Sequence, residues 1–384
     1  MKLAAILDSP APYTTPVLNA LAQRVDLHVV YLSAEDRVSR FADSMGVDPA
    51  FEYSVHGARR LDIPSVDFHL ELTIGMSRRL SALKPNAILL VSWKPATAEP
   101  LAWSRWSGTA AVMWAESTPY SGLLRGPAST YLRRIVTRAF DGYVSNGTQA
   151  TRYLEELGVP PSRIVTSRLP AAGPPSPAIV RSRASDGDAV GFLFVGRLIP
   201  QKRPLELIEA FAAVRRELPA ATLTIVGGGE LEAEVREAGA RVPGVDYLGQ
   251  LEGIDLSAVY TRSDVLVLPA LREVWGLVVN EALAHGLFVV TTDQVGSAYD
   301  LLDGDTGVVL SAEDFSAVAP ALVEVGRTVD RDADARQRRA SAVASCTPDA
   351  FATDIARAVE LAVGVRAARW RSRRRPRSTP RGNE

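Results

Sequence analysis

The chain is poor in metal-binding side chains. Its 384 residues include one cysteine, Cys346, and four histidines, at positions 28, 56, 69 and 285, without ligand-like spacing. One thiol excludes an internal disulfide and a zinc site made of several thiolates. We therefore expect no metal site, and a reducing compartment such as the cytoplasm.

Long apolar runs are also missing. No stretch approaches the roughly 18 apolar residues that span a bilayer, and the first apolar run, residues 3–7, ends at Asp8. We expect neither a membrane span nor a secretory signal. Apolar residues make up 47% and charged residues 23% of the chain, which is typical of a folded globular protein, and the length favours two domains.

Positive charge is unevenly distributed. Residues 366–384 contain eight arginines and one acid, and because the whole chain has a net charge of -1, residues 1–365 carry about -8. This body has no basic face or motif for nucleic acid, so nucleic acid is not an expected partner. The basic tail is either a solubilising end or a contact with an anionic membrane surface, where Trp370 would suit the headgroup zone.

Short apolar runs alternate with longer helical patterns, which predicts an α/β protein with parallel sheets. The expected strands are residues 3–7, 27–32, 87–91, 110–114, 142–145 and 163–166 in the first half, and 191–195, 222–226, 245–248, 265–268 and 287–291 in the second. The interval between the halves is rich in proline and glycine, which indicates a linker. The predicted parts are a first domain over 1–170, a linker over 171–188, a second domain over 189–349, a helix over 350–365 and a basic tail over 366–384.

Two cations follow the first strand of the second domain, in the segment 196–202 (GRLIPQK). Gly196 allows close backbone approach, and Arg197 and Lys202 can both reach one anionic group, which suits a diphosphate. The alternative is that both cations are simply solvated. Only four of the 43 basic residues are lysine, which favours a specific role for Lys202.

A second motif, residues 273–281 (EVWGLVVNE), follows the strand expected at 265–268. If Gly276 and Leu277 begin a helix, its first N–H groups attract phosphate. Glu281, one turn into that helix, could accept two hydrogen bonds from a ribose diol, and Glu273 would lie nearer a reacting sugar. The alternative is two solvated acids. A glycine triplet that includes Gly227 and Gly228 permits close approach of a nucleotide, but such triplets serve packing equally often.

These motifs, in this order and spacing over about residues 191–310, resemble the nucleotide-sugar half of GT-B retaining glycosyltransferases of family four. The resemblance implies two Rossmann-like domains that face each other across a cleft, with residues 189–349 binding the nucleotide sugar and residues 1–170 on the acceptor side. It implies that Arg197 and Lys202 hold the donor diphosphate, Glu273 the sugar hydroxyls and Glu281 the ribose. The remaining implied donor contacts are Gly196, Gly227, Gly228, Leu251, Trp275, Gly276, Leu277 and Val278.

The first half departs from the family. Where many members have paired glycines, this chain has residues 9–16 (SPAPYTTP), and where many have a histidine it has Glu116. Tyr13, Thr14 and Glu116 are the candidate acceptor-side residues, and Glu116 is equally well read as a solvated loop acid.

The predicted activity is transfer of a sugar from a nucleoside diphosphate sugar to a hydroxyl of a lipid-linked glycan or a small metabolite. No obvious side-chain nucleophile is present, which fits retention by same-face attack. The donor is a co-substrate, and no cofactor is expected. A sugar-nucleotide 2-epimerase of the same fold and a non-catalytic glycosyltransferase-like subunit are the alternatives. The expected location is the cytoplasm, with the tail reaching the inner membrane face.

Overall fold

The computed structural model describes residues 1–32, 48–57, 59–63, 68–92, 94–118, 127–170 and 189–374. The expected linker over 171–188 and positions 375–384 of the basic tail lie outside the described residues. In the part that is described, no helix has both the length and the apolar content that crossing a bilayer requires.

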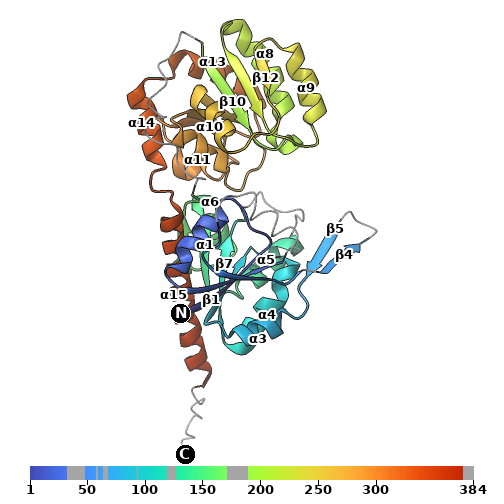
Figure 1. The fold of residues 1–384 in the computed structure, drawn as a ribbon, viewed down its shortest axis with the longest axis vertical. Coiled ribbons are helices and arrows are strands. Elements are labelled where there is room, and N and C mark those ends of the chain that lie inside the picture. The colour runs from blue at the N-terminus through green and yellow to red at the C-terminus, as the bar shows by residue number, and fades with distance from the viewer. Residues whose placement is uncertain are drawn as a thin grey trace, which may run out of the picture.

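The N-terminal domain is built on a seven-stranded parallel sheet with the order β3-β2-β1-β6-β7-β8-β9. Its strands are β1 (Lys2–Leu7), β2 (Asp26–Tyr31), β3 (Glu52–Val55), β6 (Ala87–Val91), β7 (Ala110–Ala115), β8 (Gly142–Asn146) and β9 (Ile164–Ser167). Its helices are α1 (Thr14–Ala22), α3 (Met76–Leu83), α4 (Ala98–Ser107), α5 (Pro127–Thr137) and α6 (Gly147–Glu156). An antiparallel hairpin of β4 (Arg59–Ile63) and β5 (Phe68–Leu72) projects from its side (Figure 1).

The C-terminal domain contains a six-stranded parallel sheet with the order β12-β11-β10-β13-β14-β15. Its strands are β10 (Gly191–Val195), β11 (Thr222–Val226), β12 (Val245–Tyr247), β13 (Val265–Leu268), β14 (Phe288–Thr292) and β15 (Gly307–Leu310). Its helices are α8 (Pro204–Glu217), α9 (Glu232–Arg241), α10 (Gly253–Arg262), α11 (Leu277–Ala284), α12 (Ala298–Leu301), α13 (Val318–Thr328) and α14 (Ala333–Ala342). Two parallel sheets were expected, and the α/β class is confirmed.

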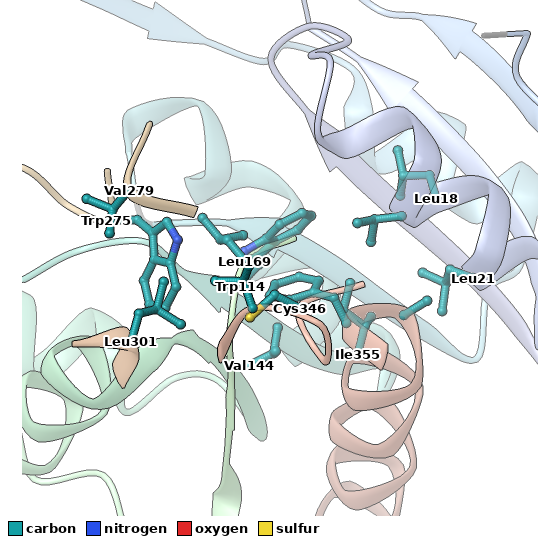
Figure 2. Packing of buried hydrophobic residues seen from close by; sticks show 14 of the residues in the cluster. Leu18, Leu21, Trp114, Val144, Leu169, Trp275, Val279, Leu301, Cys346 and Ile355 are labelled. Carbon is teal, nitrogen blue, oxygen red and sulfur yellow. The ribbon is translucent and has the colours of Figure 1, made fainter. Parts of the chain in front are cut away.

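Burial on both faces explains why these apolar runs become parallel strands. In β1, Leu3 and Ala5 face one core, shared with α1, whereas Ala4 and Ile6 face a second core, shared with α3 and α4. The first core continues into the C-terminal domain, where it includes Trp275 (Figure 2). One apolar cluster therefore joins the two domains.

All eleven expected strands are present, with ends shifted by no more than one residue. Strands β3, β4, β5 and β15 were not expected from the sequence. The segment of β4 and β5, for example, alternates charged and apolar residues and lies apart from the main sheet.

The final helix differs from the expectation. It was expected over residues 350–365, followed by a tail, but α15 (Pro348–Arg374) continues well into the basic segment. It leaves the C-terminal domain and packs along the N-terminal domain, against α1 and the strands β6 to β9 (Figure 1). A Cβ added at Gly142 of β8 would lie 2.9 Å from the Cβ of Ala362, so the glycine allows this close packing.

Two arginines of the basic segment explain why the helix continues. Asp141, fully buried directly before β8, forms ion pairs with Arg366 and Arg369, each with an N–O distance of 2.9 Å. The indole of Trp370 lies against Gly108, where an added Cβ would be 3.4 Å from the ring. This first part of the basic segment is therefore bound to the protein itself.

We expect the variant Asp141→Asn to be less stable than the wild type by about 3–5 kcal/mol, because it removes the carboxylate from the buried Arg366 and the half-buried Arg369. Urea unfolding measures the difference. The matched control is Glu360→Gln on the exposed side of α15, which should change the free energy of unfolding by less than about 0.5 kcal/mol. Equal stability of the two variants would contradict this role of Asp141.

Candidate active site

Lys202 is buried at the carboxyl end of β10, in the 3₁₀ turn Pro200–Lys202 that precedes α8. Its ammonium group forms an ion pair with the carboxylate of Glu273, 71 positions further along the chain. The backbone N–H of Leu271 donates to the carbonyl of Gln201 at 2.8 Å, which fixes the two loops together. The two motifs predicted to act on one ligand are thus in direct contact.

Burial lowers the pKa of Lys202 to about 8, and the nearby guanidinium of Arg197 contributes in the same direction. Arg197 itself is exposed on the loop that follows β10. Two cations at one strand end, one of them poorly hydrated, form a site that an anionic group would stabilise.

Glu273 and Gly276 stand in a loop held by Val295 and its neighbours. The N–H of Glu273 donates to the carbonyl of Gln294 at 3.0 Å. Gly276 has a φ of +88° and caps α11, which begins at Leu277 as expected from the sequence. An added Cβ at Gly276 would lie 3.1 Å from Val295 and 3.2 Å from Glu273, so glycine is needed both for its conformation and for space.

Glu281 lies one turn into α11, next to Val278, which is partly buried. Its carboxylate accepts a 2.7 Å hydrogen bond from the hydroxyl of Tyr260, and burial raises its pKa. His285 stacks on the ring of Tyr260 with a centroid distance of 5.0 Å. Glu281 is therefore an ordered, partly buried group rather than a solvated acid.

The glycine triplet packs against the loop of Lys202. A Cβ added at Gly227 would lie 1.9 Å from the carbonyl oxygen of Gly196, and the N–H of Leu198 donates to the carbonyl of Gly228 at 2.9 Å. This close approach gives the triplet a packing role, and a contact with a nucleotide stays a prediction. Leu251 is partly buried against the core that joins the domains.

A cavity of about 230 Å³ lies between the two domains. Its lining residues are Tyr13, Glu116, Asn146 and Leu169 from the N-terminal domain and Glu273, Val274, Trp275, Gly276 and Leu277 from the C-terminal domain. The predicted acceptor and donor sides thus meet in one space. Asn146 and Leu169 were not predicted, although Asn146 ends β8 and could have been found from its place at the carboxyl edge of the sheet.

Of two further predicted residues, Trp275 lines the cavity and Thr14 does not. The indole of Trp275 is buried and donates at 2.8 Å to Asn280, whose amide donates at 2.9 Å to the carbonyl of Leu169. This bonding gives Trp275 a structural part at the domain junction. Thr14 is buried, exchanges hydrogen bonds with Ala11 and does not line the cavity.

The N-terminal wall carries a second polar group of residues. The hydroxyl of Tyr13 donates to Glu116 at 3.3 Å, and Lys94 forms an ion pair with Asp8 nearby. Burial raises the pKa of Glu116, and burial followed by the charge of Glu116 raises the pKa of Tyr13. Glu116 is thus an ordered group of the cavity wall and not a solvated loop acid.

The whole fold is similar to solved glycosyltransferase structures. Anabaena HepE in complex with UDP has a TM-score of 0.68 and 16% identity, covering 94% of this chain and 100% of that one. The apo form of the lipopolysaccharide outer core galactosyltransferase WaaB has a TM-score of 0.70 and 14% identity, covering 94% of this chain and 99% of that one. The architecture expected from the motifs, GT-B, is confirmed.

Residues 189–327 match the family model described as "Glycosyl transferases group 1". The C-terminal domain is a group 1 glycosyltransferase domain. The resemblance drawn from the spacing of the motifs is thereby confirmed, and the motifs of Lys202 and Glu273 both lie in this group 1 domain.

The matches to curated relatives are longer than the stretch that matches the group 1 model. Glycogen synthase of Mycobacterium tuberculosis is 30% identical over 236 residues, which cover 59% of this chain and 55% of that protein. The GDP-mannose-dependent alpha-(1-6)-phosphatidylinositol monomannoside mannosyltransferase of Mycolicibacterium smegmatis is 31% identical over 213 residues, which cover 51% of this chain and 55% of that protein. The matched part spans about half the length of these relatives.

The low pKa of Lys202 predicts how binding of a nucleoside diphosphate depends on pH. Lys202 is charged below about pH 8 and neutral above it, so its attraction for the diphosphate is present at lower pH and lost at higher pH. We expect the Kd of UDP or GDP to rise above about pH 8. The terminal phosphate does not cause this change, because its second pKa is near 6 and it is already fully ionised at pH 8.

Calorimetric titration from about pH 7 to 9.5 measures this effect. The variant Lys202→Met should bind more weakly and lack the change near pH 8, whereas Arg197→Ala should move the change to higher pH because a like charge is removed. The same pH profile in Lys202→Met and wild type would show that another group causes it.

Proposed function

We propose that this protein is a retaining glycosyltransferase that moves a hexose from a nucleoside diphosphate sugar to a hydroxyl acceptor. The observation that supports this most is the direct contact of Lys202 with Glu273 beside the start of α11, within a group 1 domain. Arg197 and Lys202 bind the diphosphate, and Glu273 binds hydroxyls of the donor sugar. Glu281 binds the ribose.

The reaction breaks the bond between the anomeric carbon and the diphosphate, and the bonding pair goes to the leaving oxygen. Arg197, Lys202 and the first N–H groups of α11 stabilise the charge that develops there; preorganised donors of this kind contribute roughly a hundred- to a thousandfold each. The acceptor oxygen attacks from the face that the diphosphate leaves, which retains the configuration. These cations would make a divalent ion unnecessary.

The donor base follows from no single residue. HepE has been crystallised with UDP and glucose, and the mycobacterial mannosyltransferase is named for GDP-mannose. For this chain the donor is therefore proposed only as a class, a nucleoside diphosphate sugar.

A screen of UDP-, GDP- and ADP-sugars tests the proposal, with thermal shift and donor hydrolysis as readouts. With the best donor at saturation, Arg197→Ala and Lys202→Ala should each lower turnover by about tenfold or more, because each removes a charge from the leaving group. Turnover should be equal in EDTA and in magnesium. The control variant is Arg216→Ala at the exposed end of α8.

Near-normal turnover in both cation variants would contradict the diphosphate assignment. Loss of activity in EDTA that magnesium restores would contradict the metal-independent mechanism. Conversion of the donor sugar without an acceptor would favour the epimerase.

We also propose that the protein works in the cytoplasm and that its basic tail contacts the inner face of an anionic membrane. Arg366 and Arg369 are bound to Asp141, so this contact depends on the arginines from Arg371 onward. Each arginine near such a surface contributes on the order of 1 kcal/mol.

A truncation after Arg371 tests the tail, because it keeps both partners of Asp141 and removes five arginines. We expect the full chain to co-sediment with vesicles that contain phosphatidylglycerol, and the truncated chain to sediment less. Neutral phosphatidylcholine vesicles are the control. Equal sedimentation of both chains, or binding that salt does not weaken, would favour a solubilising tail.

A further inference from the structure

The N-terminal wall of the cavity presents a carboxylate that the donor site does not use. Glu116 follows β7, and Tyr13 lies between β1 and α1, so both stand at the carboxyl edge of the sheet. The hydroxyl of Tyr13 donates to one oxygen of Glu116 at 3.3 Å. A carboxylate accepts up to about four hydrogen bonds, so capacity for a ligand hydroxyl remains.

The charges around the cavity differ between its C-terminal wall, on the donor side, and its N-terminal wall, on the acceptor side. On the C-terminal side Lys202 pairs with Glu273, and on the N-terminal side Lys94 pairs with Asp8. Lys202 and Lys94 are thus each paired with another carboxylate, and Glu116 is bound through the neutral phenol of Tyr13. The carboxylate of Glu116 therefore suits a neutral ligand whose hydroxyl donates a hydrogen bond to it. An anionic ligand group at this place would be repelled by the carboxylate.

The size of the cavity limits what enters. Its volume of about 230 Å³ is below the roughly 300–1,000 Å³ of pockets for drug-sized ligands. The side chains of Leu169 and Leu277 offer apolar surface, while Glu116 and Glu273 offer acceptors on opposite walls. This combination fits a donor sugar against Glu273 and, on the opposite wall, the hydroxyl-bearing edge of a neutral acceptor ring against Glu116.

We propose that Glu116 accepts a hydrogen bond from the attacking hydroxyl of the acceptor, that Tyr13 positions Glu116, and that the acceptor presents a neutral ring. This inference deepens the proposed function and rests on it. In the transfer step the acceptor oxygen forms the new bond to the anomeric carbon, and its proton passes to the leaving diphosphate oxygen. Glu116 orients the hydroxyl and is unchanged at the end.

The protonation states of Tyr13 and Glu116 agree with this geometry. Burial raises the pKa of Tyr13, so its hydroxyl keeps its proton and continues to donate to Glu116. Burial also raises the pKa of Glu116, which makes its carboxylate a better hydrogen-bond acceptor when ionised.

The test separates transfer to an acceptor from binding of the donor. The best donor from the screen is incubated alone or with methyl glycosides of glucose, galactose, mannose and glucuronic acid. We expect wild-type transfer to at least one of the three neutral glycosides and less to the glucuronide. The variant Glu116→Gln should lower that transfer by about tenfold to a hundredfold, the range expected for losing a hydrogen bond to a charged group.

The Kd of the nucleotide should stay within about twofold in Glu116→Gln, because its carboxylate is not assigned to the donor. Tyr13→Phe should raise the KM for the glycoside more than it lowers kcat, and should have no further effect when Glu116 is already Gln. Glu155→Gln, on the exposed face of α6, is the matched control with no effect.

A loss of nucleotide binding in Glu116→Gln that accounts for the lost transfer would assign Glu116 to the donor and overturn the proposal. Unchanged transfer would also overturn it, as would a wild type that hydrolyses the donor but transfers to no neutral glycoside. If the wild type neither binds nor hydrolyses any nucleotide sugar, the proposed function itself fails, and this result is distinct from the others.

Discussion

The ion pair between Lys202 and Glu273 constrains the cleft. A lysine taken out of water is costly unless a partner compensates its charge, and Glu273 provides that partner. The pair can form only if the loop after β10 and the loop before α11 stay adjacent, and backbone bonds between them, such as that from Leu271 to Gln201, keep them so. The position of Gly276 at the start of α11 follows from the same adjacency.

Much of the architecture could be predicted because parallel strands covered on both faces are continuous apolar runs. The strand at 87–91 is an example, with no polar residue to interrupt it. The motifs of the group 1 domain could also be predicted from the sequence, because they are defined by the residue types and their spacing within one segment of the chain. The ion pair between Lys202 and Glu273 could not be predicted, because no local sequence pattern relates two residues that are 71 positions apart.

The remaining differences have physical causes. Trp275 was predicted as a donor contact and lines the cavity, and its hydrogen bond to Asn280 at the domain junction is a further contact that depends on the tertiary structure. The end of α15 was missed because arginines suggest solvent, and only the fold shows that Asp141 lies beneath them. Tyr13 and Glu116 were both candidates from the sequence, but the hydrogen bond between them joins two different strand ends and was not predicted.

The path of α15 also matters for protein engineering. By sequence this helix follows the group 1 domain, but in space it is part of the N-terminal domain and packs on β6 to β9. A chimera that exchanges everything after residue 188 with a relative would place a foreign helix on the native sheet, where Gly142 and Asp141 are fitted to Ala362 and Arg366. A chimera with two junctions, one in the linker and one just before Pro348, would preserve both domains.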